Sequence, residues 1–177
     1  MRTTTIAFVL LFFMHNLNAQ VEVAQLLSNQ NSNHQTGYGG FLKLGYAVSK
    51  ASALNFEAEI IFFPSKPGTG DGMGIIPIKF GYRYILSGNA GGFYIEPQIG
   101  YNIYKDIENH PSGNGGNIPE EHPTGAVAAM GIGYLFKGSF RFDVGLHYES
   151  EFYSNGNVSV IALRLGHDFC FHRKHFK

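Results

Sequence analysis

The sequence predicts an all-β fold, an eight-stranded antiparallel up-and-down transmembrane β-barrel. Two observations carry this prediction: apolar and polar residues alternate with period two along most of the chain, and the composition favours strands over helices. Glycine accounts for 23 of 177 residues, with 16 Phe, 10 Tyr and no Trp. Glycine at roughly twice its usual frequency opposes long helices, whereas Phe and Tyr favour strands.

The charge content excludes several classes of function. Thirteen basic residues balance thirteen acidic ones, and charged residues make up only 15% of the chain. A nucleic-acid partner is not expected, because no basic patch is available to bind phosphates. Cys170 is the single cysteine, so neither an intrachain disulfide nor a cysteine-based zinc site can form. We expect no cofactor and no metal.

The amino-terminal segment is typical of a secretory signal peptide. Arg2 precedes an apolar run at 6–14, and Ala19 provides a small residue before Gln20. The apolar run is about half the length needed to span a bilayer as a helix. We therefore predict cleavage after Ala19 and three parts: a signal peptide at 1–19, an outer-membrane β-barrel at 20–171 and a basic carboxyl-terminal tail at 172–177.

Each strand is predicted from its own alternation. Residues 93–104 give the clearest case, with apolar side chains at odd positions and mostly polar ones at even positions, and 21–27 give the weakest. In several strands glycine takes many of the polar-face positions. The eight predicted strands are 21–27, 37–46, 54–63, 76–86, 93–104, 125–136, 140–148 and 158–171.

The connections between these strands alternate in length. This rhythm is typical of a barrel with tight turns at one end and long loops at the other. Export places the amino terminus in the periplasm, so an even number of strands predicts inner short turns and outer long loops. The predicted long loops are 28–35, 64–74, 105–123 and 151–157, and the predicted short turns are 47–53, 87–92 and 137–139.

The polar face distinguishes a membrane barrel from a soluble sandwich or lipocalin-like barrel. It combines balanced charges with many glycines, which an exposed strand has little reason to contain. Inside a narrow barrel, glycine relieves crowding and opposite charges can pair as burial requires. We therefore predict that the apolar face meets lipid and that the charges form a luminal network. The ten predicted members are Lys43, Glu57, Glu59, Lys79, Arg83, Glu96, Arg141, Asp143, Arg164 and Asp168.

Three segments carry a resemblance to a known family. Residues 93–101, 131–134 and 162–169 resemble the small outer-membrane β-barrel domain proteins of Gram-negative bacteria, broadly similar to OmpA and OmpX. The resemblance implies location in the cell outer membrane, contact with outer-membrane lipid and recognition by the barrel-assembly machinery. The last strand resembles the family's assembly signal, although His167 and the basic tail depart from its pattern. Such barrels serve many functions, so the fold alone does not define one.

One pair of residues suggests catalysis. Lipid A deacylases are small outer-membrane barrels that use a His and a Ser two positions apart on one strand face. Here Ser150 lies three positions from His147, which puts the two on opposite faces of a regular strand unless a bulge near Glu149 intervenes. We interpret His147 as a luminal residue at the rim, paired with Glu149 or a nearby arginine.

The longest predicted loop holds the contact candidates. Its spacing through glycines and prolines fixes no metal geometry, so we interpret it as a solvated acidic loop. The candidates are Asp106, Glu108, His110, Glu120, Glu121 and His122. We predict a non-enzymatic outer-membrane barrel with a charge-plugged lumen, displaying extracellular loops for structural or binding roles, with a further envelope protein as a possible partner. A lipid A-modifying enzyme and a narrow pore are the alternatives.

Overall fold

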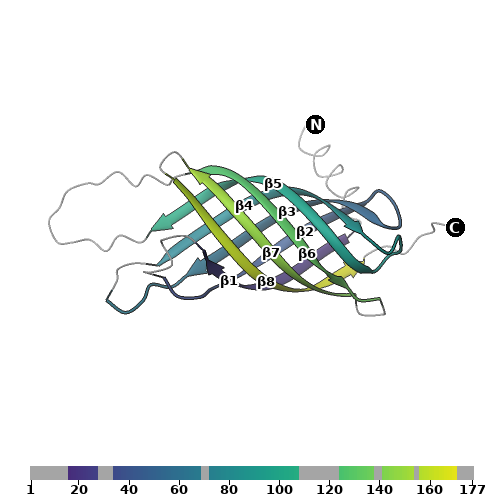
Figure 1. Cartoon of the computed structure of the whole chain (residues 1–177), viewed down its shortest axis with the longest axis horizontal. Coiled ribbons are helices and arrows are strands. Elements are labelled where there is room, and N and C mark those ends of the chain that lie inside the picture. Colours follow the sequence, from purple (N-terminus) through teal and green to yellow (C-terminus); the bar gives the residue numbers. More distant parts are fainter. Residues whose placement is uncertain are drawn as a thin grey trace, which may run out of the picture.

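The computed structural model describes residues 16–27, 34–68, 72–107, 124–137, 141–153 and 156–170, which form a closed barrel (Figure 1). Each strand pairs antiparallel with the next, and β8 pairs with β1. The predicted eight-stranded antiparallel barrel is therefore confirmed. Its strands are β1 (Asn16–Leu26), β2 (Gly37–Ala47), β3 (Ser52–Phe63), β4 (Met73–Ile85), β5 (Gly92–Ile107), β6 (Gly125–Leu135), β7 (Phe142–Tyr153) and β8 (Gly156–Cys170). No helix in the described part of the chain is long and apolar enough to cross a membrane.

The two ends of the barrel differ in their connections. The connections at 48–51, 86–91 and 136–141 lie at the end where β1 begins and β8 ends, which we call the short-turn end. Those at 27–36, 64–72, 108–124 and 154–155 lie at the other end, the long-loop end. The predicted long loop at 151–157 is wrong, because β7 and β8 continue to a connection of two residues. The pairing of Tyr153 with Gly156 closes this hairpin, and Gly156 adopts a φ of 141°.

The first strand extends beyond the predicted start of the mature chain. It pairs with both β2 and β8 from Asn16 onward. The predicted cleavage after Ala19 therefore falls within β1, and it stays a prediction.

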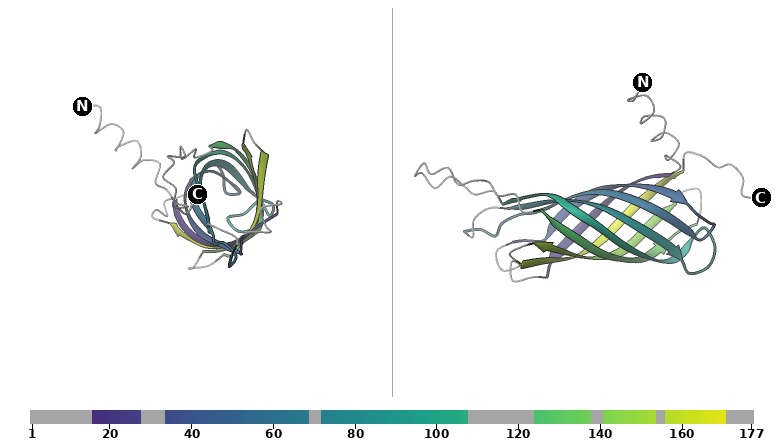
Figure 2. Two further views of the ribbon diagram at one scale, coloured as in Figure 1. Left: turned by 90° about the vertical axis from the view of Figure 1, so that its left-hand side faces the viewer. Right: turned by 90° about the horizontal axis from the view of Figure 1, so that it is seen from above.

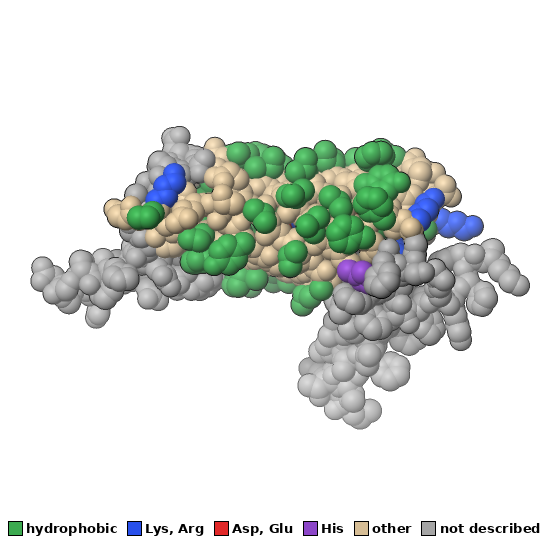
Figure 3. Space-filling model, turned by 90° about the horizontal axis from the view of Figure 1, so that it is seen from below, with side chains coloured by type: hydrophobic (Ala, Val, Ile, Leu, Met, Phe, Trp, Pro, Cys, Tyr) green, Lys and Arg blue, Asp and Glu red, His purple; other side chains and the backbone are tan. Residues whose placement is uncertain are grey.

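Alternation divides the side chains between an outer and an inner face. Outward residues such as Phe93 and Ile99 are 67% and 72% exposed, whereas their sequence neighbours Tyr94 and Gln98 are buried. Hydrophobic side chains cover the middle of the barrel wall, and the visible Lys and Arg side chains lie toward its two ends (Figure 3). Exposed aromatic rings flank this apolar belt, as they do at the two interfaces of membrane barrels. Toward the long-loop end they are Tyr38, Phe62, Tyr101 and Phe152, and toward the short-turn end Tyr46, Tyr84, Phe93, Phe136 and Phe142.

One irregularity interrupts the ladder between β4 and β5. Ile76 pairs with Tyr104 but Pro77 pairs with Asn102, which leaves Ile103 as the extra residue of a β-bulge. Proline has no N–H to donate to a ladder, so its presence within a paired strand favours such a break. The backbone N–H of Ile76 donates instead to Oδ1 of Asn102 at 3.2 Å.

Luminal glycines make room for the large charged side chains, as the sequence predicts. A Cβ atom placed on Gly100 would lie 2.8 Å from Cγ of Lys79 and 2.2 Å from the carbonyl oxygen of Ile78. On the neighbouring strand, a Cβ on Gly131 would approach no atom closer than 3.4 Å, an ordinary contact. Both glycines are inward-facing, so they form a matched pair.

We expect Gly100→Ala to destabilise the barrel by about 1–3 kcal/mol, because the added methyl group overpacks the lumen against Lys79 and the backbone. Gly131→Ala should unfold at nearly the wild-type temperature. The measurement is the temperature at which each folded barrel changes its mobility on SDS gels. Equal unfolding temperatures for the two variants would contradict the close packing at Gly100.

Candidate functional site

The interior of the barrel, which the left view of Figure 2 shows nearly end-on, is the candidate functional site. An arginine organises its middle layer. Arg164 on β8 reaches three glutamates with its three nitrogens. Nε bonds Glu22 at 2.8 Å, Nη1 bonds Glu57 at 3.0 Å and Nη2 bonds Glu59 at 2.7 Å. Its guanidinium also lies over the ring of Phe41, 4.2 Å from the centroid. One planar cation therefore ties β8 to β1, β2 and β3.

Lys79 forms a second centre in the same layer. Its Nζ lies 3.1 Å from Oε1 of Glu57 and 2.5 Å from Oε2 of Glu149, and it also pairs with Glu59. The Lys79 side chain is fully buried, as are those of Glu57 and Glu59. These contacts connect β4 to β3 beside it and to β7 across the lumen. The charges therefore stabilise the closed barrel as a whole, in addition to one pair of neighbouring strands.

Glu57 and Glu96 link this layer to the short-turn end. Nζ of Lys43 lies between them, 3.1 Å from Glu57 and 2.6 Å from Glu96. Arg83 then bridges Glu96 at 2.5 Å and Asp143 at 2.7 Å. The guanidinium of Arg83 also stacks 4.0 Å from the centroid of the Tyr94 ring.

Polar side chains complete the network around these charges. The amide nitrogen of Gln98 donates to Glu57 at 3.1 Å and to Glu96 at 2.8 Å, which leaves its oxygen facing His147. Nε2 of His147 lies 2.9 Å from that oxygen, and an amide oxygen only accepts, so the proton of this bond sits on Nε2. The predicted pairing of His147 with Glu149 or an arginine is wrong. His147 is buried within the lumen on the amide of Gln98, and Glu149 is occupied by Lys79.

The structure brings together eight of the ten predicted network residues, among those whose side chains it describes. Arg141 precedes β7 and is half-buried, and its Nη2 donates to the carbonyl oxygen of Ala90 at 3.4 Å, so its membership of the network stays a prediction. The Asp168 side chain lies outside the described residues. The eight are Lys43, Glu57, Glu59, Lys79, Arg83, Glu96, Asp143 and Arg164.

Three luminal carboxylates were not predicted from the sequence as members of the network. Glu22 lies on the weakest predicted strand, and Glu149 and Glu151 were assigned to the rim and to a loop. All three face the lumen and are buried. Continuing the alternation of β7 beyond His147 would have found two of them. With these additions, seven buried carboxylates face four buried cations among the described side chains.

Hydrophobic side chains fill the lumen at the long-loop end, where the alternation alone indicates a polar interior. We call this cluster the apolar plug. The rings of Phe63 and Tyr153 extend the plug over a glycine on the neighbouring strand, Gly37 of β2 and Gly125 of β6. A Cβ on Gly37 would lie 2.4 Å from the ring of Phe63, and one on Gly125 would lie 2.8 Å from the ring of Tyr153. The plug comprises Ala24, Leu26, Ile61, Phe63, Met73, Ile75, Val158, Val160 and Ala162, with Tyr153 packed against it.

A polar contact joins the apolar plug to the charged layer below it. Nδ2 of Asn102 donates to Oε2 of Glu151 at 2.8 Å and lies 2.7 Å from the hydroxyl of Tyr153. Glu151 and Asn102 are fully buried. Buried side chains therefore occupy the described interior at successive levels, from the apolar plug to Arg83 and Asp143 near the short-turn end.

The candidate catalytic pair does not assemble. His147 faces the lumen, whereas Ser150 lies on the outer face, where its hydroxyl bonds Tyr148 at 2.9 Å and Ser159 at 3.0 Å. The pairing of β7 with β6 and with β8 is regular from Asp143 to Phe152, so no bulge brings the two residues to one face.

Among the described residues, no group of three or more His, Cys, Asp or Glu side chains is arranged to hold a metal ion. The six contact candidates of the longest predicted loop, Asp106, Glu108, His110, Glu120, Glu121 and His122, lie outside the described side chains.

Comparison with solved structures identifies the class of fold. The chain is similar to the amino-terminal β-barrel domain of Pseudomonas aeruginosa OprF, with a TM-score of 0.58, 13% identity and coverage of 88% of this chain and 98% of that one. It is also similar to Neisserial surface protein A (TM-score 0.61, 15% identity, 88% and 96% covered). The attachment invasion locus protein of Yersinia pestis gives a TM-score of 0.58 at 10% identity, with 87% and 97% covered. No protein-family model and no curated protein matches the chain.

These similarities show an eight-stranded barrel of the small outer-membrane type. The outward apolar belt with its flanking aromatic rings has the form that such a barrel needs in lipid. The fold and the belt together place the protein in the outer membrane, as the sequence predicts.

We expect Arg164→Met to destabilise the barrel by about 3–5 kcal/mol, because it leaves Glu22, Glu57 and Glu59 without their shared cation in a lumen already rich in carboxylates. Lys66→Met removes an exposed positive charge and should have little effect. The measurement is the free energy of unfolding in urea, followed by gel mobility in lipid vesicles.

A second substitution separates the loss of charge pairing from a simple packing defect. Adding Glu59→Gln to Arg164→Met removes one of the three carboxylates that lose this cation and should recover part of the lost stability. If the double variant is less stable than Arg164→Met by the full cost of Glu59→Gln alone, the two residues are not coupled and the ion-pair network does not exist in this form.

Proposed function

We propose that the protein is a closed, non-catalytic outer-membrane barrel whose filled interior makes it a rigid support for binding loops at the long-loop end. The observation that carries the proposal is the burial of side chains across the lumen at successive levels. Phe63 and Leu26 of the apolar plug are fully buried, and so are Lys79 and Glu57 below them. An eight-stranded barrel is only wide enough to be filled by its own side chains, so a filled interior favours support over transport.

The described parts of two outer connections support this role. Backbone N–H of Gln35 donates to the carbonyl oxygen of Pro64 at 2.7 Å, and the Gln35 side chain donates to the carbonyl oxygen of Ser65 at 2.7 Å. His34 forms an isolated β-bridge with Ser65. The connections at 27–36 and 64–72 are therefore tied to each other above the barrel wall, which favours a defined binding surface at this end.

The connection at 108–124 is the longest at this end. A join between adjacent strands needs far fewer residues, and unneeded length in a loop favours a contact role. We therefore propose that Glu108, His110, Glu120, Glu121 and His122, with Asp106 at the end of β5, contribute to the contact with an envelope or external partner.

Purified protein in a planar lipid bilayer should give no steady single-channel conductance, because the apolar plug and the buried ion pairs obstruct the lumen. A general porin added to the same membrane provides the positive control. A large, steady conductance from the pure protein would refute the closed barrel and favour the narrow pore.

Orientation can be tested by labelling two lysines at opposite ends. In a Cys170→Ser background, Lys66→Cys should react with a membrane-impermeant maleimide on intact cells, whereas Lys137→Cys should react only after the outer membrane is permeabilised. Both lysines are exposed on the barrel, so access to the compartment decides the result. If only Lys137→Cys is labelled on intact cells, the orientation is opposite to the one proposed, and the long loops face the periplasm.

A further inference from the structure

The exposed charges among the described side chains have one sign. Among the side chains that the structure describes, every carboxylate lies inside the lumen, whereas Lys50, Lys66 and Lys137 are exposed. Two of these lysines, Lys50 and Lys137, lie in turns of the short-turn end. The described outer surface at this end therefore presents positive charge that no described carboxylate offsets.

Lys137 is held in a defined place by the neighbouring turn. A Cβ on Gly91 would lie 2.5 Å from Cγ and 3.2 Å from Cε of Lys137, so the lysine stem rests directly on the glycine backbone. Arg141, in the same turn as Lys137, donates to the carbonyl oxygen of Ala90. The turns 86–91 and 136–141 are thus joined by two basic side chains, and none of the ion pairs among the described side chains involves Lys137.

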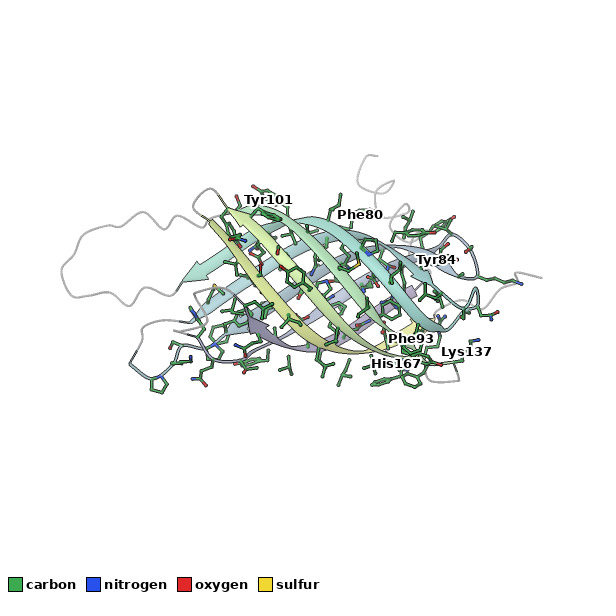
Figure 4. All side chains as sticks on the ribbon, in the orientation of Figure 1. Phe80, Tyr84, Phe93, Tyr101, Lys137 and His167 are labelled. Carbon is green, nitrogen blue, oxygen red and sulfur yellow. The ribbon has the colours of Figure 1, made fainter. Side chains whose placement is uncertain are left out.

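A cluster of exposed aromatic rings lies on the outer face at the same end of the barrel as this lysine. The rings of Phe93 and Tyr134 meet edge to face with centroids 4.9 Å apart, and those of Tyr134 and Phe136 with centroids 4.8 Å apart. Phe142 continues the row, 6.2 Å from Phe136. We call Phe93, Tyr134, Phe136 and Phe142 the aromatic platform. Phe136 directly precedes Lys137 in the chain, and Figure 4 shows Phe93 and Lys137 at the same end of the barrel.

We propose that Lys137 and the aromatic platform form a binding site for one anionic phospholipid of the membrane around the barrel. The lysine ammonium binds the phosphate, which carries the negative charge of the headgroup. The glycerol and the first part of the acyl chains pack on the aromatic rings. The apolar stem of Lys137 on Gly91 keeps the ammonium at the level where the aromatic belt ends.

Two features favour a lipid over a protein occupant. The aromatic platform is continuous with the lipid-facing belt, since Phe93 and Phe142 belong to the strands that form it. The exposed lysine complements a negative headgroup at the height where such headgroups lie. In the orientation proposed above, the lipid lies in the periplasmic leaflet, and only this placement rests on that orientation.

The test is native mass spectrometry of detergent-purified protein equilibrated with equal amounts of phosphatidylglycerol and phosphatidylcholine. Wild type should retain phosphatidylglycerol in preference to phosphatidylcholine. Lys137→Gln should weaken this preference about fivefold, the loss expected for one basic residue at a lipid surface. Lys50→Gln is the matched control, because it removes the same charge from another turn of the same end, and it should behave as wild type.

A second variant tests the aromatic half of the site. Phe136→Leu removes one ring from the outer surface without touching the lumen, and it should shorten retention of phosphatidylglycerol while the folded gel mobility is unchanged. Equal losses in Lys50→Gln and Lys137→Gln, or equal retention of the two lipids by wild type, would overturn the proposal. Because the experiment is done in detergent, its failure would leave the closed lumen and the orientation of the loops unaffected.

Discussion

The structure depends on the mutual neutralisation of charged side chains inside a closed barrel. Burying a charge is costly unless it is paired and hydrogen-bonded, so the strands that carry Glu57, Lys79 and Arg164 are stable in this arrangement only when all of them meet around one lumen. Closure supplies these partners, because Lys79 reaches Glu149 across the interior and Arg164 reaches Glu57 and Glu59 three strands away around the barrel. The network and the closed barrel therefore stabilise each other.

The remaining features of the barrel follow from this constraint. Large ion-paired side chains need space, which glycines such as Gly100 provide by letting Lys79 lie against the backbone. The outer face is left free for apolar residues, which meet lipid. At the long-loop end the apolar plug replaces charge with hydrophobic packing, and Phe63 and Tyr153 cover the glycines of β2 and β6. A filled and rigid interior then makes the ends of the barrel, and not its centre, the places where binding is expected.

The alternation of apolar and polar residues made most of the fold predictable, because odd and even positions of a strand face opposite sides of the barrel wall. The alternation does not show how far along the barrel axis a residue lies. Ile61 and Phe63 share the face of Glu57 and Glu59, yet they lie at the long-loop end and form the apolar plug. Strand ends were equally hard to predict: the polar run near Glu151 resembles a loop, although its alternation continues, and Arg141 lies just before β7 begins. The bond between His147 and Gln98 joins residues 49 positions apart, so only the closed barrel reveals it.

Solid-state NMR of the protein in lipid bilayers, with ¹⁵N-labelled lysine and ¹³C-labelled glutamate, tests the central claim most directly. The ion-pair network predicts through-space correlations between the Nζ of Lys79 and glutamate carboxylate carbons, assigned by their loss in Lys79→Met. It also predicts slow exchange of the Lys79 ammonium protons with water. A Lys79 ammonium that exchanges rapidly and shows no carboxylate correlation would mean that the lumen is open to water and that the charges do not close it.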